Sequence, residues 1–192
     1  KIGEEFNIKV NFAITDMNQP LGCFSGLICE VIESIEVLKG GGPKDLIDIV
    51  YHLGKICLRM AGIDNPEMKI KQVLNNGTAY EVLCRMVSEH GGLLKEMKLN
   101  PKEINYIKSD NNGSIDFIDT KQIGNCINSL CYQDSNNTIK IDNQAGCEIF
   151  KKIGEPVKRD EIIAKIFCSS KDNLRLVKKK FKEAFKISND SL

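Results

Sequence analysis

The chain has 192 residues, of which 42% are hydrophobic and 28% are charged, and this balance excludes a disordered or fibrous protein. Its 27 basic and 26 acidic residues leave a net charge of +1, too small for the whole surface to attract nucleic acid or an anionic membrane. The longest uncharged stretch, residues 17–29, is broken by polar residues, glycine and proline, and falls short of the roughly 20 apolar residues of a membrane helix. We therefore expect a globular protein with small neutral substrates and with no nucleic-acid or membrane partner.

The beginning of the chain and its cysteines indicate its context. Residues 1–5 include no initiator methionine and no apolar signal-peptide core, which predicts that the chain begins inside a longer protein. The eight cysteines are scattered without a C-x-x-C pair, and most lie within apolar runs. This usage is typical of buried free thiols in a reducing compartment, so we expect a cytoplasmic protein without disulfides or zinc.

In the first half, one strand and four helices are expected. Residues 8–15 begin with apolar and polar alternation and end in an apolar run, which predicts a buried strand that leads into a loop over 16–22. Apolar residues then recur at helical spacing, with glycine or Asn-Gly at the ends of the stretches. The predicted helices cover residues 28–38, 43–61, 66–75 and 78–90, with Asn65 as the N-cap of the third and Thr78 with Glu81 as a capping box in the fourth.

The pattern changes near residue 95 and predicts a second unit. Residues 104–109 and 115–117, on either side of the turn 110–113, predict a strand, a turn and a strand. The remaining expectations are a helix over 120–130, a polar loop over 133–138, strands over 146–150 and 162–168, and a closing helix with Leu174, Val177, Phe181 and Phe185 on one face.

Residues 15–22, Thr-Asp-Met-Asn-Gln-Pro-Leu-Gly, resemble the thymidine and pyrimidine-nucleoside phosphorylases. The match continues in register through residues 38–46 and, in the second half, through residues 118–120 and the stretch Lys-Ile-Gly-Glu-Pro-Val at 152–157. It covers the whole chain but only about the back half of a family member. The resemblance implies the α/β fold class: residues 1–97 as the back portion of a mixed-sheet α/β domain, and residues 98–192 as a smaller α+β C-terminal domain.

The resemblance also implies a reaction, phosphorolysis by a pentosyltransferase of nucleoside salvage. Phosphate attacks the anomeric carbon of a pyrimidine nucleoside and releases the free base and a pentose 1-phosphate. Inorganic phosphate is then the co-substrate, no organic cofactor is needed, and the full-length family member is a homodimer. The family's groups that hold the phosphate and the base lie upstream of residue 1, so we assign no catalytic residue here and expect this fragment alone to be inactive.

Two small sets of residues are candidates for a site. Thr15, Asp16 and Met17 follow the carboxyl end of the predicted strand, where open α/β sheets place their ligand crevice, so we expect them to line the substrate cleft. The competing interpretation is that this is only a tight, capped loop. Some family members bind a monovalent cation such as K+ through two carbonyls and a carboxylate, which match Leu21, Phe24 and Glu33; otherwise Glu33 is an ordinary helix carboxylate.

The chain departs from the family pattern at Leu27, where bacterial members carry Asn, and over residues 131–138, which replace a Gly-rich, Arg-containing loop. Two other functions stay open. One is a non-catalytic scaffold or binding protein derived from the family. The other is a carrier-like module within residues 113–168, modified on Lys151 or Lys152. The lone histidines, His52 and His90, have no metal-spaced partners and are interpreted as structural or surface residues.

Overall fold

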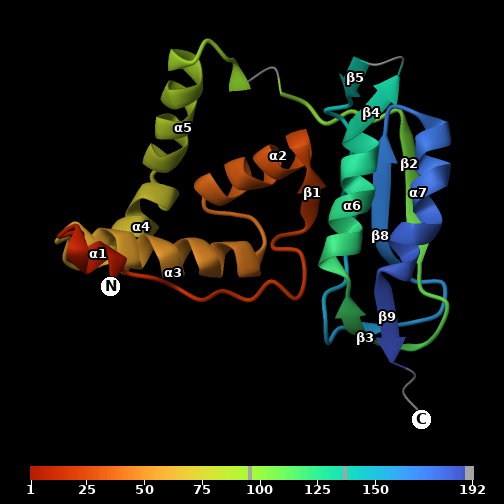
Figure 1. The fold of residues 1–192 in the computed structure, drawn as a ribbon, viewed down its shortest axis with the longest axis horizontal. Coiled ribbons are helices and arrows are strands. Elements are labelled where there is room, and N and C mark those ends of the chain that lie inside the picture. The colour runs from red at the N-terminus through yellow and green to blue at the C-terminus, as the bar shows by residue number, and fades with distance from the viewer. Residues whose placement is uncertain (95–96, 136–137, 189–192) are drawn as a thin grey trace.

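A computed structural model describes residues 1–94, 97–135 and 138–188 of the chain, in a helical first part and a second part built on antiparallel sheets (Figure 1). The first part contains α1 (Ile2–Glu5), β1 (Phe24–Gly26), α2 (Leu27–Leu38), α3 (Lys44–Met60), α4 (Pro66–Asn75) and α5 (Thr78–Glu89). The second part contains β2 (Glu103–Lys108), β3 (Gly113–Ile118), α6 (Thr120–Cys131), β4 (Tyr132–Ser135), β5 (Thr138–Ile141), β6 (Gly146–Ile149), β7 (Pro156–Val157), β8 (Ile162–Cys168), α7 (Lys171–Glu183) and β9 (Phe185–Ser188).

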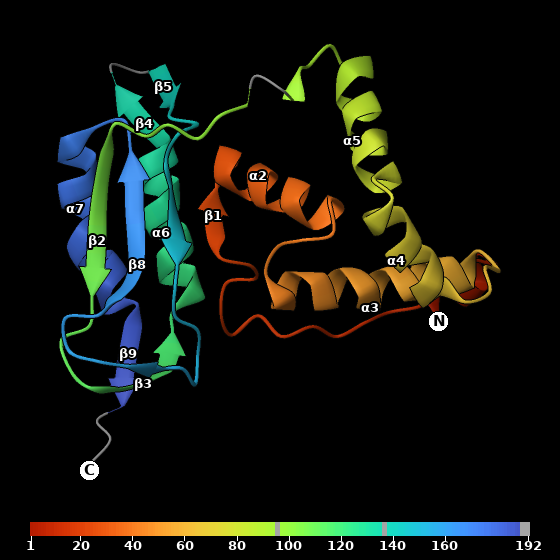
Figure 2. The same cartoon turned by 180° about the vertical axis from the view of Figure 1, so that it is seen from behind.

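The largest sheet has the strand order β1-β6-β8-β2, and all of its neighbours are antiparallel. Helices α6 and α7 pack side by side over one face of this sheet, whereas the view from behind looks directly onto its strands (Figures 1 and 2). A second sheet, β7-β3-β9, and the pair β4-β5 complete the second part. Since β1 belongs to the first part and pairs with β6, the two parts share one sheet.

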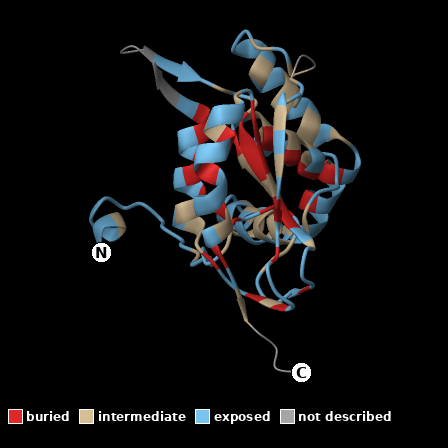
Figure 3. Ribbon diagram, turned by 90° about the vertical axis from the view of Figure 1, so that its right-hand side faces the viewer, coloured by how far each residue is buried: buried red, intermediate tan, exposed pale blue. Residues whose placement is uncertain are grey.

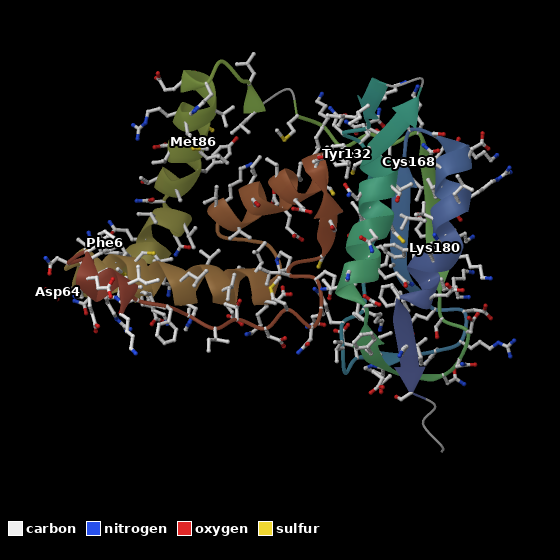
Figure 4. All side chains as sticks on the ribbon, in the orientation of Figure 1. Phe6, Asp64, Met86, Tyr132, Cys168 and Lys180 are labelled. Atoms are coloured by element: carbon white, nitrogen blue, oxygen red, sulfur yellow. The ribbon has the colours of Figure 1, made fainter. Side chains whose placement is uncertain are left out.

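The main cluster of buried hydrophobic residues lies in the second part. Its buried side chains come from the inner face of the large sheet, from β3 and from the facing sides of α6 and α7, and Figure 3 shows them gathered in the centre of this part. Among the largest are Ile107, Ile115, Ile166 and Phe181. Cys168, at the end of β8, is also buried, and Lys180 lies on α7 (Figure 4). Five of the eight cysteines are buried, as their apolar surroundings predict.

The first part buries much less. The buried residues of its helices are Cys29, Glu33 and Val37 on α2 with Ile70 and Leu74 on α4, whereas α3 and α5 have no buried residue. Large apolar side chains such as Met86 on α5 and Phe6 beyond α1 are exposed (Figure 4). Because burial of apolar area is the main stabilising contribution in folding, the first part depends on contacts other than a core of its own.

The strand predicted over residues 8–15 is wrong for the structure described here. The segment is extended and exposed, with Phe12 at 83% and Ile14 at 90% exposure, and it stands away from the body of the molecule in Figure 3. A strand forms only when a neighbouring strand takes up its backbone hydrogen bonds, and no strand of the described residues pairs with this one. The alternation of apolar and polar residues therefore indicates a preference for pairing with another strand, and it does not by itself produce a strand.

The four predicted helices of the first part are confirmed as α2 to α5, but one of the two cap assignments is wrong. Asn65 is the N-cap of α4 as predicted, in the left-handed conformation and without a capping side-chain bond. Gly77, not Thr78, is the N-cap of α5, and the amide of Thr78 donates to Oδ1 of Asn76 at 3.0 Å. This error shifts a helix start by a single residue, which the spacing of apolar residues does not resolve.

In the second part the strands over 104–109 and 115–117 exist, but they do not form a hairpin, because β2 pairs with β8 and β3 with β7 and β9. The predicted polar loop over 133–138 is instead the paired strands β4 and β5, with residues 136–137 outside the described residues. The closing helix ends at Glu183, and Phe185 begins β9. The pairing of β2 with β8 and of β3 with β9 is long-range, and local sequence patterns do not specify it. The β4–β5 hairpin and the end of α7 are local features that the sequence pattern did not reveal.

Gly26 is the residue at which the shared sheet can be tested. It pairs with Gly146, has φ +144°, and an added Cβ would lie 2.5 Å from the carbonyl oxygen of Ala145. We expect Gly26→Ala to lower the free energy of unfolding by about 2 kcal/mol, since both backbone strain and a clash with backbone are introduced. Urea unfolding measures this difference.

Gly124→Ala is the matched control, since a Cβ at this position in α6 meets nothing within 4 Å. It should raise stability by roughly 0.5–1 kcal/mol, the usual gain of alanine over glycine inside a helix. Equal effects of the two substitutions would contradict a close approach of β1 and β6 at Gly26.

Candidate functional site

The loop over residues 16–23 connects the exposed N-terminal segment to β1 and carries three of the six candidate site residues, Asp16, Met17 and Leu21. It is bordered by two cavities. Thr15 and Asp16 line the first cavity, of about 510 Å³, together with Asp45, Asp48 and His52 of α3. The structure thus places two of the three predicted cleft residues at the rim of one depression, beside a group of polar side chains.

The second cavity, of about 320 Å³, lies on the other side of the loop, between α2 and the N-terminal end of α6. Met17, Leu21, Phe24 and Glu33 all line it. The three residues expected to hold a cation are therefore brought together, while Met17 is separated from Thr15 and Asp16. Residues 19–21 are shared by both cavities, so the loop is the wall between them.

Glu33 is a buried carboxylate that organises the end of this loop. It projects from α2, and its Oε1 accepts a hydrogen bond from the Cys23 amide at 2.8 Å. Burial raises the pKa of Glu33 above its ordinary value of 4.5, while the amides of Cys23 and Phe24 and the Lys152 ammonium act in the opposite direction. The carboxylate is held in a fixed orientation with its negative charge only partly compensated.

This donor set fits a monovalent cation. Hard cations prefer carboxylate and carbonyl oxygens, and residues 21, 24 and 33, which carry such oxygens, all line one cavity. Among the described residues no cluster of three or more His, Cys, Asp or Glu side chains is arranged to hold a metal ion. A cation in this cavity would therefore depend on backbone carbonyls and on Glu33.

The sequence reasoning did not assign Asp45 or Lys152 to this site, and it considered Lys152 only as a carrier lysine. Asp45, in the first turn of α3, accepts from the Gly22 amide at 3.2 Å and from Lys152 Nζ at 3.1 Å. Lys152, between β6 and β7, also donates to the carbonyl oxygens of Pro20 and Gly22. Both residues lie in the stretches that carry the family resemblance, but the sequence does not show that these stretches meet.

The same contacts contradict the carrier-like alternative. Lys152 is bound to the loop, and Lys151 forms an ion pair with Glu161 at 2.9 Å and donates to the carbonyl of Pro156. Modification of a carrier requires a lysine that is presented freely to an enzyme, and here both ammonium groups are engaged. His90 is exposed, and its ring Nδ1 lies 2.8 Å from the carbonyl oxygen of Met86.

Comparison with known proteins agrees with this geometry. Residues 114–188 match the family model of the pyrimidine nucleoside phosphorylase C-terminal domain. The chain is 30% identical over 187 residues to a thymidine phosphorylase of Metamycoplasma hominis, covering 93% of this chain and 69% of that protein. It is 30% identical over 196 residues to a pyrimidine-nucleoside phosphorylase of Staphylococcus haemolyticus and 28% identical over 170 residues to a thymidine phosphorylase of Mycobacterium tuberculosis.

The chain belongs to the thymidine and pyrimidine-nucleoside phosphorylase family. It spans 45% of the length of the Staphylococcus haemolyticus relative and 39% of the Mycobacterium tuberculosis relative. The expected α/β fold class is confirmed, with mixed helices and antiparallel sheet in the arrangement described above. None of the helices in the described ranges has both the length and the apolar character needed to cross a bilayer.

The burial of Glu33 predicts how stability depends on pH. Because its pKa is raised in the folded protein, its contribution to stability is fully present below the unfolded pKa, near 4.5, and is lost as the pH rises through the folded pKa. Glu33→Gln keeps an oxygen for the Cys23 amide and removes the charge. We expect the stability of the variant relative to the wild type to increase between pH 4.5 and pH 7.5.

Urea unfolding of both proteins across this pH range measures the difference, and other titrating groups cancel in it. Glu30→Gln on the same helix is the control, since Glu30 is exposed and accepts from the Gly26 amide. A difference between Glu33→Gln and wild type that stays constant with pH would contradict a buried, charge-penalised Glu33.

Proposed function

We propose that this chain is the C-terminal portion of an enzyme that cleaves pyrimidine nucleosides with phosphate. A phosphate oxygen forms a bond to the anomeric carbon while the bond from that carbon to the base breaks, which yields pentose 1-phosphate and the free base. The observation that carries the proposal is the 30% identity to a thymidine phosphorylase of which the chain covers 69%. Thymidine, uridine and deoxyuridine are the candidate nucleosides, and phosphate is the co-substrate.

In this proposal the chain supplies one wall of the cleft and not the reacting groups. Thr15 and Asp16 line one cavity beside the loop and Met17 lines the other, which supports a position of these residues near the nucleoside. The groups that bind phosphate and base are expected in the portion of the relatives that this chain does not match. The exposed segment 8–15 and the unburied faces of α3 and α5 are suited to pack against that portion.

A monovalent cation such as K+ completes the proposed site, held by the carbonyls of Leu21 and Phe24 and by the Glu33 carboxylate. When bound, it supplies a fixed positive charge beside the loop. The chain's own residues then orient the loop: Glu33 holds the Cys23 amide, and Asp45 holds the Gly22 amide. The proposed enzyme works in the cytoplasm, as a homodimer in its full-length form.

The isolated chain is expected to be inactive. Purified chain incubated with thymidine and phosphate should release no thymine above a blank without protein, because the groups that polarise phosphate and base are not among these residues. Absorbance of released base or chromatography measures the reaction. Phosphate-dependent thymine release by the isolated chain would contradict this expectation and would place catalytic groups within residues 1–192.

The activity itself is tested on the natural gene product. Antibodies raised against this chain should retain, from a lysate of the source cells, an activity that releases base from thymidine, uridine or deoxyuridine only when phosphate is present. Beads with pre-immune antibody are the control. Retained intact protein that cleaves none of the three nucleosides, with phosphate and K+ supplied, would overturn the proposal and favour the non-catalytic scaffold.

A further inference from the structure

Lys152 connects the second part of the molecule to the loop over residues 16–23. Its side chain is only 19% exposed, and Nζ donates to the carbonyl oxygen of Pro20 at 2.5 Å, to that of Gly22, and to Oδ2 of Asp45 at 3.1 Å. An ammonium group has three donors, and these three acceptors can use all of them. The Lys152 ammonium is therefore surrounded by three oxygen acceptors, as a bound cation would be. Its backbone belongs to the turn between β6 and β7.

The turn that carries Lys152 is itself held firmly. The Lys152 amide donates to Oε2 of Glu155 at 2.7 Å, and the Glu155 amide returns a bond to the Lys152 carbonyl at 3.1 Å. The Gly154 amide is bonded to the carbonyl of Ile115 on β3 at 2.8 Å. Because this turn is already anchored to the core, it loses little conformational freedom when Lys152 binds the loop. The contact can therefore fix the conformation of the loop.

Three other hydrogen bonds from the second part reach the same loop. The Ile153 amide donates to Oε1 of Gln19 at 2.9 Å, and Oγ1 of Thr120 donates to the carbonyl of Met17 at 3.3 Å. The Ile149 amide of β6 donates to the carbonyl oxygen of Cys23 at 2.7 Å. With the contacts of Lys152, the second part reaches the loop at residues 17, 19, 20, 22 and 23, which is nearly its whole length.

The charges around the loop explain why Lys152 should stabilise it more than the uncharged hydrogen bonds do. Asp45 and the buried Glu33 bring two carboxylates to the end of this loop, and each accepts a loop amide. Lys152 forms an ion pair with Asp45 and acts on Glu33 at longer range. Removing one partner of a partly buried ion pair leaves the other charge without compensation, which is more destabilising than the pair is stabilising.

We propose that Lys152 is a positioning residue that fixes the loop of residues 16–23, and with it the cleft residues Asp16 and Met17. Its link to nucleoside binding rests on the proposed function, whereas the positioning itself does not. The C-terminal domain thereby sets the shape of a wall that belongs to the first part. Loss of the ammonium should release the loop while the sheets and the core of the second part stay intact.

The test is amide hydrogen exchange, followed by NMR, on the chain and on Lys152→Met, which keeps the apolar stem and removes the charge. We expect the Gly22, Cys23 and Ile153 amides to exchange at least tenfold faster in the variant, while the amides paired between β2 and β8 keep their rates. Lys151→Met is the matched control, since Lys151 is the neighbouring lysine and bonds Glu161 and Pro156 instead of the loop.

Two further variants separate positioning from a general structural role. Lys152→Arg retains positive charge and donors, so it should bring the loop exchange rates back to within about threefold of wild type. Asp45→Asn combined with Lys152→Met should exchange no faster than Lys152→Met alone, because partners in one network are not additive.

Unchanged loop exchange in Lys152→Met, equal loss of protection in β2 and β8, or an arginine variant as fast as the methionine variant would each overturn the proposal. The exchange measurement uses no nucleoside and no enzymatic turnover. Its failure therefore leaves the phosphorolysis assay unaffected, and failure of that assay leaves the positioning result standing.

Discussion

The structure depends first on the pairing of β1 with β6. Through residues Phe24–Gly26 the helical first part joins the large sheet of the second part. The main cluster of buried hydrophobic residues lies in that second part. Glycine at both Gly26 and Gly146 lets the two backbones approach, and the buried Cys29 thiol packs beside them. Since α3 and α5 bury no residue completely, the position of the first part is set by this short strand and by the polar contacts that flank it.

Those polar contacts come from both parts of the molecule and meet at the loop of residues 16–23. Glu33 and Asp45 each hold one amide at the end of the loop, and Lys152 then joins the loop carbonyls to the C-terminal domain. Apolar packing is permissive about small shifts, whereas hydrogen bonds specify distance and direction. The loop of residues 16–23 is therefore held by bonded carbonyls and amides and not only by packed apolar groups. Under the proposed function, this is how the C-terminal domain would shape the nucleoside cleft.

Much of the fold could be predicted from the sequence, because helix periodicity is local. The apolar stripes of α2 to α6 and the runs of β6 and β8 give those elements to within a few residues. The pairing of β2 with β8 and of β3 with β9 could not be predicted from the sequence, because strands far apart in the chain leave no local signal of their pairing. For the site, the family resemblance selected Leu21, Phe24 and Glu33, which line one cavity. The contact of Lys152 with Asp45 could be seen only in three dimensions.

The extended segment over residues 8–15 has one more consequence, for the behaviour of the isolated chain in solution. Its apolar side chains at positions 8, 10, 12 and 14 share the parity of a strand face, they are exposed, and the segment carries a single charge and no proline. Such a segment is a template for intermolecular β-pairing. Concentrated preparations of this chain are thus prone to self-association through their N-terminal ends, and a peptide or protein portion that occupies the segment would act as a solubilising partner.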